Sequence, residues 1–199
     1  MIAIVDYGMG NLRSVQKAFE YLGYDAAITD QSKALENASH IVLPGVGAFR
    51  DAIAALKAKD LDGVIKKEVA EGKPFLGICL GMQMLFDRSS EDGEYEGLGL
   101  IGGEVVRFDT DLKIPHIGWN TLYYNKRTAL FDGIDDNYFY FVHSYHAAKV
   151  AKEDVETTCV YGYDFVESVN RDNIWGVQFH PEKSGDTGLK VLKNFGAIK

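Results

Sequence analysis

The chain has 199 residues, 46% of them apolar, which suits one domain over residues 1–199 with a substantial core. Its 21 basic and 29 acidic residues leave a formal net charge of −8, and no arginine-rich run offsets it, so a nucleic-acid partner is not expected. No stretch approaches the roughly 20 apolar residues that cross a bilayer. No basic region precedes the first apolar run, and the two cysteines make no disulfide framework. We therefore expect a cytoplasmic protein without membrane contact.

Short apolar runs alternate with helical patterns over the first part of the chain. The expected strands are residues 1–6, 24–29, 40–44 and 74–78, and the expected helices are residues 10–23 and 48–71. Asn11 and Gly23 suit the two caps of the first helix, and Gly72 suits the end of the second. Strands that alternate with helices predict a parallel sheet covered on both faces.

From Gly99 onward the pattern changes to short strands separated by turns. The expected strands are residues 102–108, 120–124, 138–142, 155–162 and 174–179, and a helix is expected over residues 184–198. No long helix separates these strands, which indicates an antiparallel or mixed sheet joined to the α/β part. The sequence therefore predicts a single α/β domain with a mixed central sheet, flanking helices and a small additional antiparallel sheet.

Cys79 lies between two glycines in the stretch GICLG, residues 77–81. An apolar run precedes this stretch and a helical pattern follows it, as in the nucleophile elbow of strand-to-helix turns. Glycines two residues to either side avoid Cβ clashes in such a turn and expose the central side chain above the sheet. The N–H groups at the start of the following helix stabilise a thiolate or an oxyanion. We interpret Cys79 as a nucleophile rather than a buried structural cysteine.

Of the five histidines, His180 best suits the role of base. It ends an apolar strand and is followed by Pro181, which breaks the strand, and by Glu182. Residues two apart in an extended segment share a face, so Glu182 is expected to orient the His180 imidazole. Cys79, His180 and Glu182 thus form a candidate nucleophile, base and orienting group. His143 and His146 are expected to face opposite sides of a strand end, which argues against a metal site there.

The loop PGVGAF, residues 44–49, follows the third expected strand at the same edge of the sheet as Cys79. Gly45 and Gly47 allow its backbone to approach a ligand and to expose N–H groups. Such groups could stabilise the oxyanion of an acyl-transfer reaction, although an ordinary flexible loop would have the same composition.

These motifs resemble class I (triad-type) glutamine amidotransferases. The resemblance lies in PGVGAF, GICLGMQ and FHPEKS, and it runs from the first expected strand to the last expected helix. Within the class, DYGMGNLRSV, PHIGWN, YFVHSYHA and VQFHPEKS are similar to the glutaminase subunits of imidazole glycerol phosphate synthases, which act in histidine biosynthesis. The resemblance implies a flavodoxin-like fold and a glutamine amidotransferase type 1 domain. His146 departs from it, because another aromatic residue is more usual there.

The resemblance also implies a glutaminase that needs no cofactor and no metal. Cys79 would attack the amide of glutamine to form a glutamyl thioester, with His180 and Glu182 completing the triad. The implied oxyanion donors are the backbone N–H groups of Leu80, Val46 and Gly47. The implied glutamine-binding residues are Gly47, Gln83, His143, Ser144 and Tyr145.

A partner outside this chain is implied as well. It would be a cyclase subunit with a (β/α)8-barrel fold, which forms a heterodimer with the glutaminase and receives its ammonia. The barrel would convert a phosphorylated ribulosyl intermediate (PRFAR) to imidazole glycerol phosphate and an aminoimidazole carboxamide ribotide (AICAR). The implied interface residues are Met9, Gly10, Asn11, Trp119, Tyr138 and Lys183. The resemblance further suggests that the loop at Val46 and Gly47 is misaligned until the cyclase and its ligand bind.

Four other interpretations remain open from the sequence. YGMGNLR imitates a dinucleotide-binding fingerprint with Asp30 about 20 residues beyond it, but Arg13 occupies its third glycine position. An α/β-hydrolase would place the acid before the histidine, whereas Glu182 follows His180. A catalytically silent binding module could keep the same fold, and a class I amidotransferase subunit could serve a different synthase.

Overall fold

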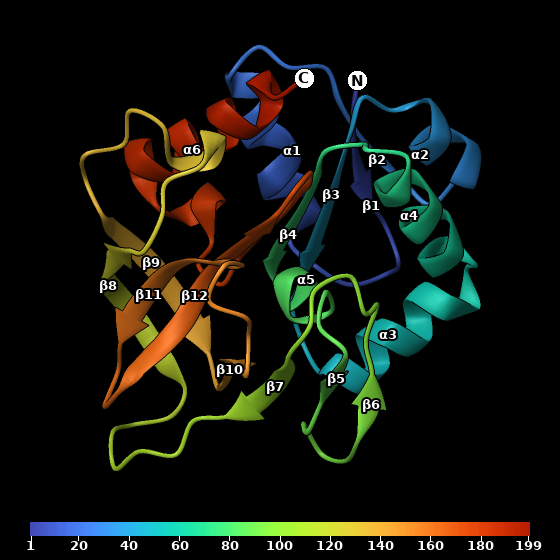
Figure 1. Cartoon of the computed structure of the whole chain (residues 1–199). Coiled ribbons are helices and arrows are strands. Elements are labelled where there is room, and N and C mark those ends of the chain that lie inside the picture. Colours follow the sequence, from blue (N-terminus) through green and yellow to red (C-terminus); the bar gives the residue numbers. More distant parts are fainter.

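The computed structural model describes all residues, 1–199, as an α/β fold built on a mixed sheet (Figure 1). The strands are β1 (Ile2–Val5), β2 (Ala26–Thr29), β3 (His40–Gly45), β4 (Phe75–Cys79), β5 (Arg88–Ser89), β6 (Tyr95–Glu96), β7 (Glu104–Arg107), β8 (His116–Tyr124), β9 (Tyr138–His143), β10 (Tyr145–Ala148), β11 (Val155–Val160), β12 (Asp164–Arg171) and β13 (Ile174–Val177). The α-helices are α1 (Leu12–Tyr21), α2 (Ser32–Asn37), α3 (Phe49–Ala58), α4 (Leu61–Ala70), α5 (Leu80–Gln83) and α6 (Gly185–Ala197). Two short 3-10 helices are η1 (Ala129–Phe131) and η2 (Pro181–Lys183).

The sheet begins with parallel strands and continues with mainly antiparallel ones, although β5 and β7 pair in parallel. Its order is β2-β1-β3-β4-β13-β12-β10-β7-β5-β6. The first five strands in this order, β2, β1, β3, β4 and β13, are parallel to one another. The antiparallel strands β8, β9 and β11 join this sheet through the pairing of β11 with β12. The expected mixed sheet is confirmed, with the small antiparallel part continuous with the main sheet.

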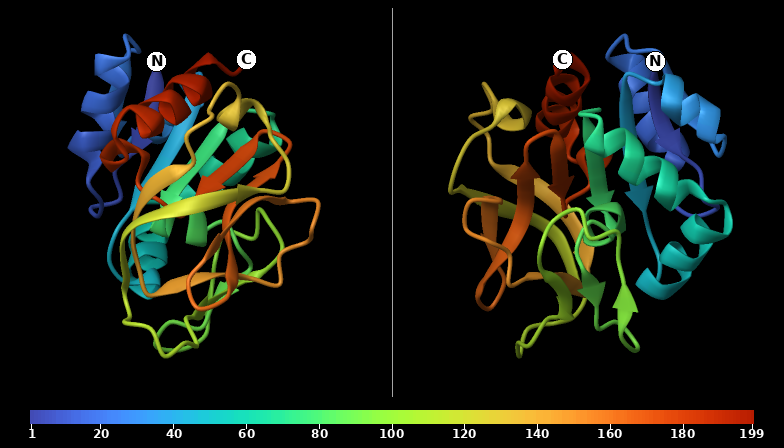
Figure 2. Two further views of the ribbon diagram at one scale, coloured as in Figure 1. Left: turned by 90° about the vertical axis from the view of Figure 1, so that its left-hand side faces the viewer. Right: turned by 45° about the vertical axis from the view of Figure 1, so that its right-hand side comes forward.

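Alternating side chains of the central strands supply two apolar layers. Ala3 and Val5 of β1 pack with α2, α3 and α4 on one face, whereas Ile2 and Ile4 pack with α1 and α6 on the other. This alternation is the period of two that a strand imposes. Figure 1 shows α2, α3 and α4 along one side of the parallel strands. Both termini lie at one end of the molecule, and the carboxyl ends of the parallel strands point away from it (Figure 2).

Several element boundaries differ from those that the pattern predicts. The expected helix over residues 48–71 is two helices, because Asp60 has a left-handed backbone (φ +55°) between α3 and α4. Asn11 precedes α1 but does not cap its backbone, since its side chain accepts a hydrogen bond from Ser14 Oγ instead. The α2 helix and strands β5, β6, β10 and β12 were not predicted.

Candidate active site

Cys79 is the last residue of β4, at the carboxyl edge of the parallel strands, and the chain turns there into α5. Its backbone has φ +56° and ψ −112°, a strained conformation for a residue with a Cβ atom. The neighbouring glycines make this turn sterically possible. A Cβ atom on Gly81 would lie 1.7 Å from the Leu43 carbonyl oxygen, and one on Gly77 would lie 2.6 Å from the Gly81 carbonyl oxygen. The turn therefore has the geometry of a nucleophile elbow.

His180 and Glu182 lie together where the chain leaves β13. His180 Nδ1 donates to Glu182 Oε1 at 2.9 Å, and both side chains are almost fully buried. The second ring nitrogen, Nε2, makes no hydrogen bond of standard geometry to any protein atom. Burial by itself lowers the pKa of His180, but the adjacent Cys79 and Glu182 favour the imidazolium and together raise the pKa to about 10. A protonated His180 at neutral pH suits a thiolate partner and the later donation of a proton.

A cavity of about 330 Å3 brings the predicted catalytic and substrate residues together. Its lining residues are Val46, Gly47, Cys79, Leu80, Gln83, Glu91, Val142, His143, Ser144, Tyr145 and His180. Every residue assigned to the oxyanion or to glutamine from the sequence is among them. Of the three triad residues, only Glu182 lies outside the cavity lining, since it contacts the Nδ1 side of His180.

The loop of Val46 and Gly47 is held against the turn that carries Cys79. Gly47 has φ +98°, and a Cβ atom there would lie 2.8 Å from Met9 Cε. One residue before the loop, a Cβ atom on Gly45 would lie 2.7 Å from Tyr7 Oη and 2.8 Å from Leu80 Cβ. Tyr7 Oη also donates to the Pro44 carbonyl at 3.0 Å. Only glycines fit this close packing, and Met9 is the side chain that touches the loop from outside.

At the far end of the cavity, the neutral side chains of His143 and His116 form a hydrogen-bonded histidine row. His143 Nδ1 is 2.8 Å from the Tyr145 carbonyl, which can only accept, so Nδ1 carries the proton and Nε2 accepts from His116 Nδ1 at 3.0 Å. Burial lowers the pKa of His143 to about 3 and that of His116 to about 4, so both are neutral. Gln83 Nε2 donates to the same Tyr145 carbonyl at 3.0 Å.

The expectation that His143 and His146 face opposite sides is wrong. Both rings pack on Phe108, with ring centroids 5.1 Å and 4.6 Å from it. Ser144 separates β9 from β10, so the two histidines belong to different strands and their alternation restarts. Within the structure, no three His, Cys, Asp or Glu side chains converge as metal ligands.

Glu91 is a cavity residue that the sequence interpretation missed. Its Oε2 accepts from the Phe49 backbone N–H at the start of α3, at 2.7 Å, so the carboxylate is held in place. Burial raises its pKa. It is the only carboxylate in the cavity lining, and it lies in an irregular loop between β5 and β6, where no periodic pattern could have singled it out.

The residues assigned to a partner interface are all at least partly exposed. Trp119 and Tyr138 are about half exposed, at 46% and 48%, and their rings stack at 5.7 Å between centroids. They are therefore not core aromatics. Lys183 is exposed in η2, which is fixed to β9 because Ser184 Oγ accepts from the Tyr140 N–H. Met9, Gly10 and Asn11 are half-buried in the loop before α1.

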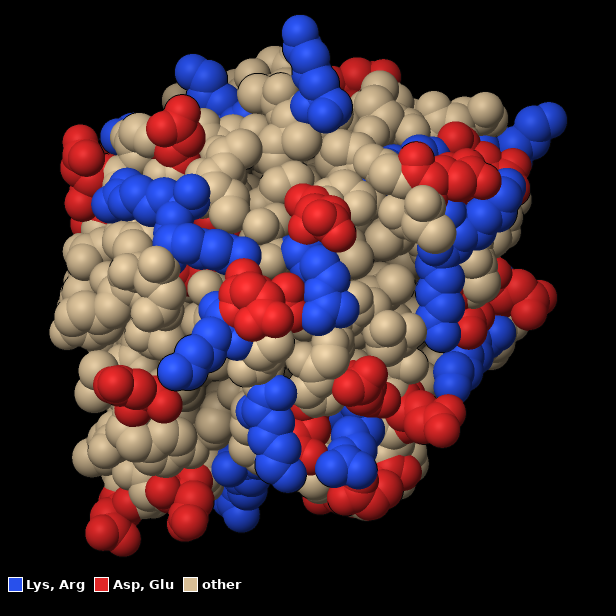
Figure 3. Space-filling model, viewed as in Figure 1, with Lys and Arg blue, Asp and Glu red and all other residues tan.

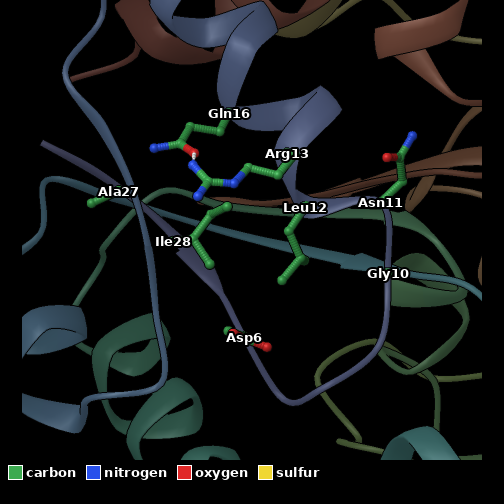
Figure 4. Close-up of a pocket in the computed structure, with 8 residues that line it drawn as sticks. All are labelled: Asp6, Gly10, Asn11, Leu12, Arg13, Gln16, Ala27 and Ile28. Carbon is green, nitrogen blue, oxygen red and sulfur yellow. Dashed lines mark hydrogen bonds between the residues drawn. The ribbon is translucent and has the colours of Figure 1, made fainter.

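A second cavity, of about 610 Å3, has no triad residue in its lining, and Figure 4 shows the residues that form it. It is formed by the loop and first turns of α1 together with β2, where Arg13 donates to Gln16. The stretch YGMGNLR, residues 7–13, which imitates a dinucleotide-binding fingerprint, forms part of this cavity. Asp30, the acid that such a fingerprint would require, forms an ion pair with Lys59 instead.

None of the helices combines the length and the apolar character that a membrane-spanning helix needs.

Comparisons with known proteins agree with this geometry. The family model for glutamine amidotransferase class-I matches residues 3–198. The chain is 54% identical to the imidazole glycerol phosphate synthase subunit HisH of Desulfitobacterium hafniense, over 98% of this chain and 93% of that protein. It is 51% identical to the subunit of the same name from Caldanaerobacter subterraneus subsp. tengcongensis, over 100% and 98%.

Solved structures share the fold at low sequence identity. A crystal structure of a glutamine amidotransferase superposes with a TM-score of 0.78 at 19% identity, covering 99% of this chain and all of that one. The structure of PurLQS from Thermotoga maritima gives 0.77 at 21% identity, covering 98% of this chain and 96% of that one. With the family model spanning almost every residue, the chain belongs to the class I glutamine amidotransferase family.

Proposed function

We propose that this chain is the glutaminase subunit of an imidazole glycerol phosphate synthase. The observation that carries the proposal is the single cavity at which Cys79, His180 and the oxyanion loop meet. Relatives that are 51% and 54% identical over nearly the whole chain bear the name of this subunit. We further propose the cytosol as its compartment, because the reaction needs Cys79 as a reduced thiol.

The proposed reaction has two stages. In the first, the Cys79 thiolate attacks the side-chain carbonyl carbon of glutamine, and the oxyanion is stabilised by the N–H groups of Leu80, Val46 and Gly47. His180 gives its proton to the leaving nitrogen, which departs as ammonia and leaves a glutamyl thioester. In the second stage, water attacks the thioester while His180 takes up a proton. Glutamate is released and the Cys79–His180 pair is restored.

The cavity wall suits the amino-acid end of glutamine. The Glu91 carboxylate offers an ion pair to the α-ammonium group, and it is pre-positioned by the Phe49 N–H. Polar groups of Gln83, Ser144 and Tyr145 line the same space. We assign these residues to binding because a polar substrate needs partners for each desolvated group.

The exposed face of β8 and β9 suits a protein partner. Trp119, Tyr138 and Tyr140 form an aromatic cluster on this face, and Ile117 and Tyr123 of β8 are exposed as well. Exposed aromatic residues of this kind are typical of interface centres. On the side of the molecule drawn in Figure 3, basic and acidic side chains are interspersed. We propose a (β/α)8-barrel cyclase as the partner, which joins the ammonia to PRFAR and forms imidazole glycerol phosphate and AICAR.

The contact between Met9 and Gly47 suggests how the partner could act on catalysis. Met9 belongs to the proposed interface, and its side chain touches the oxyanion loop. A cyclase that shifts Met9 would change the position of the Val46 and Gly47 N–H groups. We propose that this contact keeps the isolated subunit less active than the complex.

The test combines this chain with a cyclase barrel, PRFAR and glutamine. We expect imidazole glycerol phosphate and glutamate to form in equal amounts, and Cys79→Ser to stop both while added ammonia restores the imidazole product alone. A product that forms with ammonia but never with glutamine would contradict the glutaminase role. Glutamate release that the barrel leaves unchanged would point to a different synthase as the partner.

A further inference from the structure

A buried amide lies behind the nucleophile and has no place in the reaction described so far. Gln178 follows β13 and is fully buried. Its Nε2 lies 3.6 Å from Cys79 Sγ, and its Oε1 accepts from Gln83 Nε2 at 3.0 Å. Gln178 is not among the residues that line the glutamine cavity. Among the atoms that react, Gln178 therefore contacts only the sulfur of Cys79.

The surrounding hydrogen bonds fix which end of the Gln178 amide faces the sulfur. The Tyr145 carbonyl can only accept, so Gln83 must turn its nitrogen toward it. The same Gln83 nitrogen also faces Gln178, which must then present its oxygen. The Gln178 nitrogen is left to point at Cys79, and the reversed orientation would set two donors against each other at Gln83.

The backbone around Gln178 is anchored as well. Its N–H donates to the Glu167 carbonyl at 2.8 Å, and the N–H of Phe179 donates to Glu167 Oε1 at 3.3 Å. On the other side of Gln83, the Tyr145 carbonyl is held by the histidine row that reaches Asn120 in β8. The strands of the sheet therefore hold both Gln178 and the Tyr145 carbonyl to which Gln83 is bound.

We propose that Gln178 is a catalytic residue whose Nε2 donates a hydrogen bond to the Cys79 sulfur and favours the thiolate. A donor stabilises an ionised acceptor more than a neutral one, so this bond is stronger to the thiolate than to the thiol. Gln178 contacts the sulfur, and His180, two residues further along the same segment after β13, lines the cavity beside it. The proposal rests on Cys79 acting as the nucleophile of the proposed glutaminase.

The test measures alkylation of Cys79 by iodoacetamide as a function of pH, with the modified peptide quantified by mass spectrometry. Gln178→Met keeps the length of the side chain and removes the donor. We expect the pH midpoint of alkylation to move upward by about one unit, which is about tenfold less thiolate on its acidic side. The titratable groups around the sulfur are Tyr7, Glu91, His143, His180 and Glu182, and the substitution leaves all of them in place.

Gln16→Met is the matched control, because it makes the same chemical change at a half-buried amide far from Cys79, where Gln16 donates to the Ala26 carbonyl. We expect it to leave the midpoint unchanged. If Gln178→Met fails to fold, Gln83→Met replaces it, since loss of Gln83 frees the Gln178 amide to turn. Gln83→Met should move the midpoint upward by a smaller amount.

An unchanged midpoint in folded Gln178→Met would overturn the proposal. Alkylation requires no glutamine turnover, so it decides the role of Gln178 even if the chain proves to lack glutaminase activity. In the active complex we expect Gln178→Met to lower kcat about tenfold with KM for glutamine unchanged. A rise in KM with kcat unchanged would indicate substrate binding and would also contradict the proposed role.

Discussion

The charge of His180 is set by two neighbours that oppose the effect of burial. Burial disfavours the imidazolium, whereas Cys79 and Glu182 favour it and raise the pKa of His180 to about 10. The hydrogen bond from Nδ1 to Glu182 also fixes the ring orientation and leaves Nε2 toward the cavity side. In the proposed mechanism, the protonation and orientation of His180 therefore depend on Glu182 as much as on the groups that would touch the substrate.

Replacing Glu182 by Gln tests this dependence. Gln keeps the acceptor for His180 Nδ1 but removes the negative charge, so the pKa of His180 should fall and the imidazolium should be lost near neutral pH. We expect kcat for glutamate release to fall by about a hundredfold or more, with KM changed little. Kinetics of the complex with its cyclase measure both. A kcat within a few-fold of the wild-type value would contradict the assigned role.

Glu91→Gln separates binding from chemistry. The variant keeps an acceptor for the Phe49 N–H, so the loop should retain its position. It removes the charge that would pair with the α-ammonium group, so we expect KM for glutamine to rise about tenfold or more with a smaller change in kcat. An unchanged KM would mean that the ammonium group binds elsewhere.

At the scale of elements, the buried strand β12 supports the strand that carries the site. Glu167 of β12 is fully buried and holds the Phe179 N–H just before His180. Its other carboxyl oxygen bonds with Thr157 Oγ1 of β11. Burial raises the pKa of Glu167 to about 8, so the carboxyl group is neutral in the folded protein at pH 7.

This raised pKa makes stability depend on pH in a defined direction. Between the ordinary pKa of a glutamate and about 8, the unfolded chain releases a proton that the folded chain keeps. Folding stability is therefore lost as pH rises through this range, by about 1.4 kcal/mol per pH unit from this group. Glu167→Gln removes this pH-dependent contribution. The free energy of unfolding of the variant should therefore increase relative to that of the wild type from about pH 5 to about pH 8. Urea unfolding at several pH values checks this, and a constant difference would contradict it.

The sequence predicted the strands and glycines of the site better than its polar contacts. GICLG could be predicted because steric limits link this turn directly to residue type. The His180–Glu182 contact was predicted correctly but for the wrong reason, because Glu182 lies in the 3-10 helix η2 and not in an extended strand, so a tight turn and not strand alternation brings the two side chains together. Gln178 and Glu91 could not be predicted, because the first is one polar residue in an apolar strand and the second lies in a loop. Strand β12 was missed because its buried Glu167 and Ser168 interrupt the apolar pattern, and Asp60 gives no pattern that predicts the break between α3 and α4.

At the scale of the whole molecule, the active site and the aromatic face share one strand. Tyr138 and Tyr140 alternate outward along β9, and Val142, two residues further, lines the cavity that contains Cys79 and His180. The Tyr140 carbonyl also accepts from the His180 N–H at 3.0 Å. A partner on this face would therefore lie close to the ammonia that the cavity releases.

Trp119→Ala and Tyr138→Ala test the face as a docking site. Both side chains are half exposed, so we expect little change in the free energy of unfolding. Affinity for the cyclase should fall about tenfold or more, as for aromatic residues at interface centres. Tyr21→Ala, at the end of α1 and 80% exposed, is the control and should bind as the wild type does. Equal affinity of all variants in calorimetry would place the interface elsewhere.

The most direct measurement is glutamate release from glutamine by the isolated chain, by the chain with a cyclase barrel, and by that complex with PRFAR. We expect release to be low for the chain alone, to rise strongly in the complete complex, and to disappear in Cys79→Ser. High and equal release in all three mixtures would contradict the proposed link between the partner and the oxyanion loop. No release from a verified complex with reduced Cys79 would contradict the glutaminase itself.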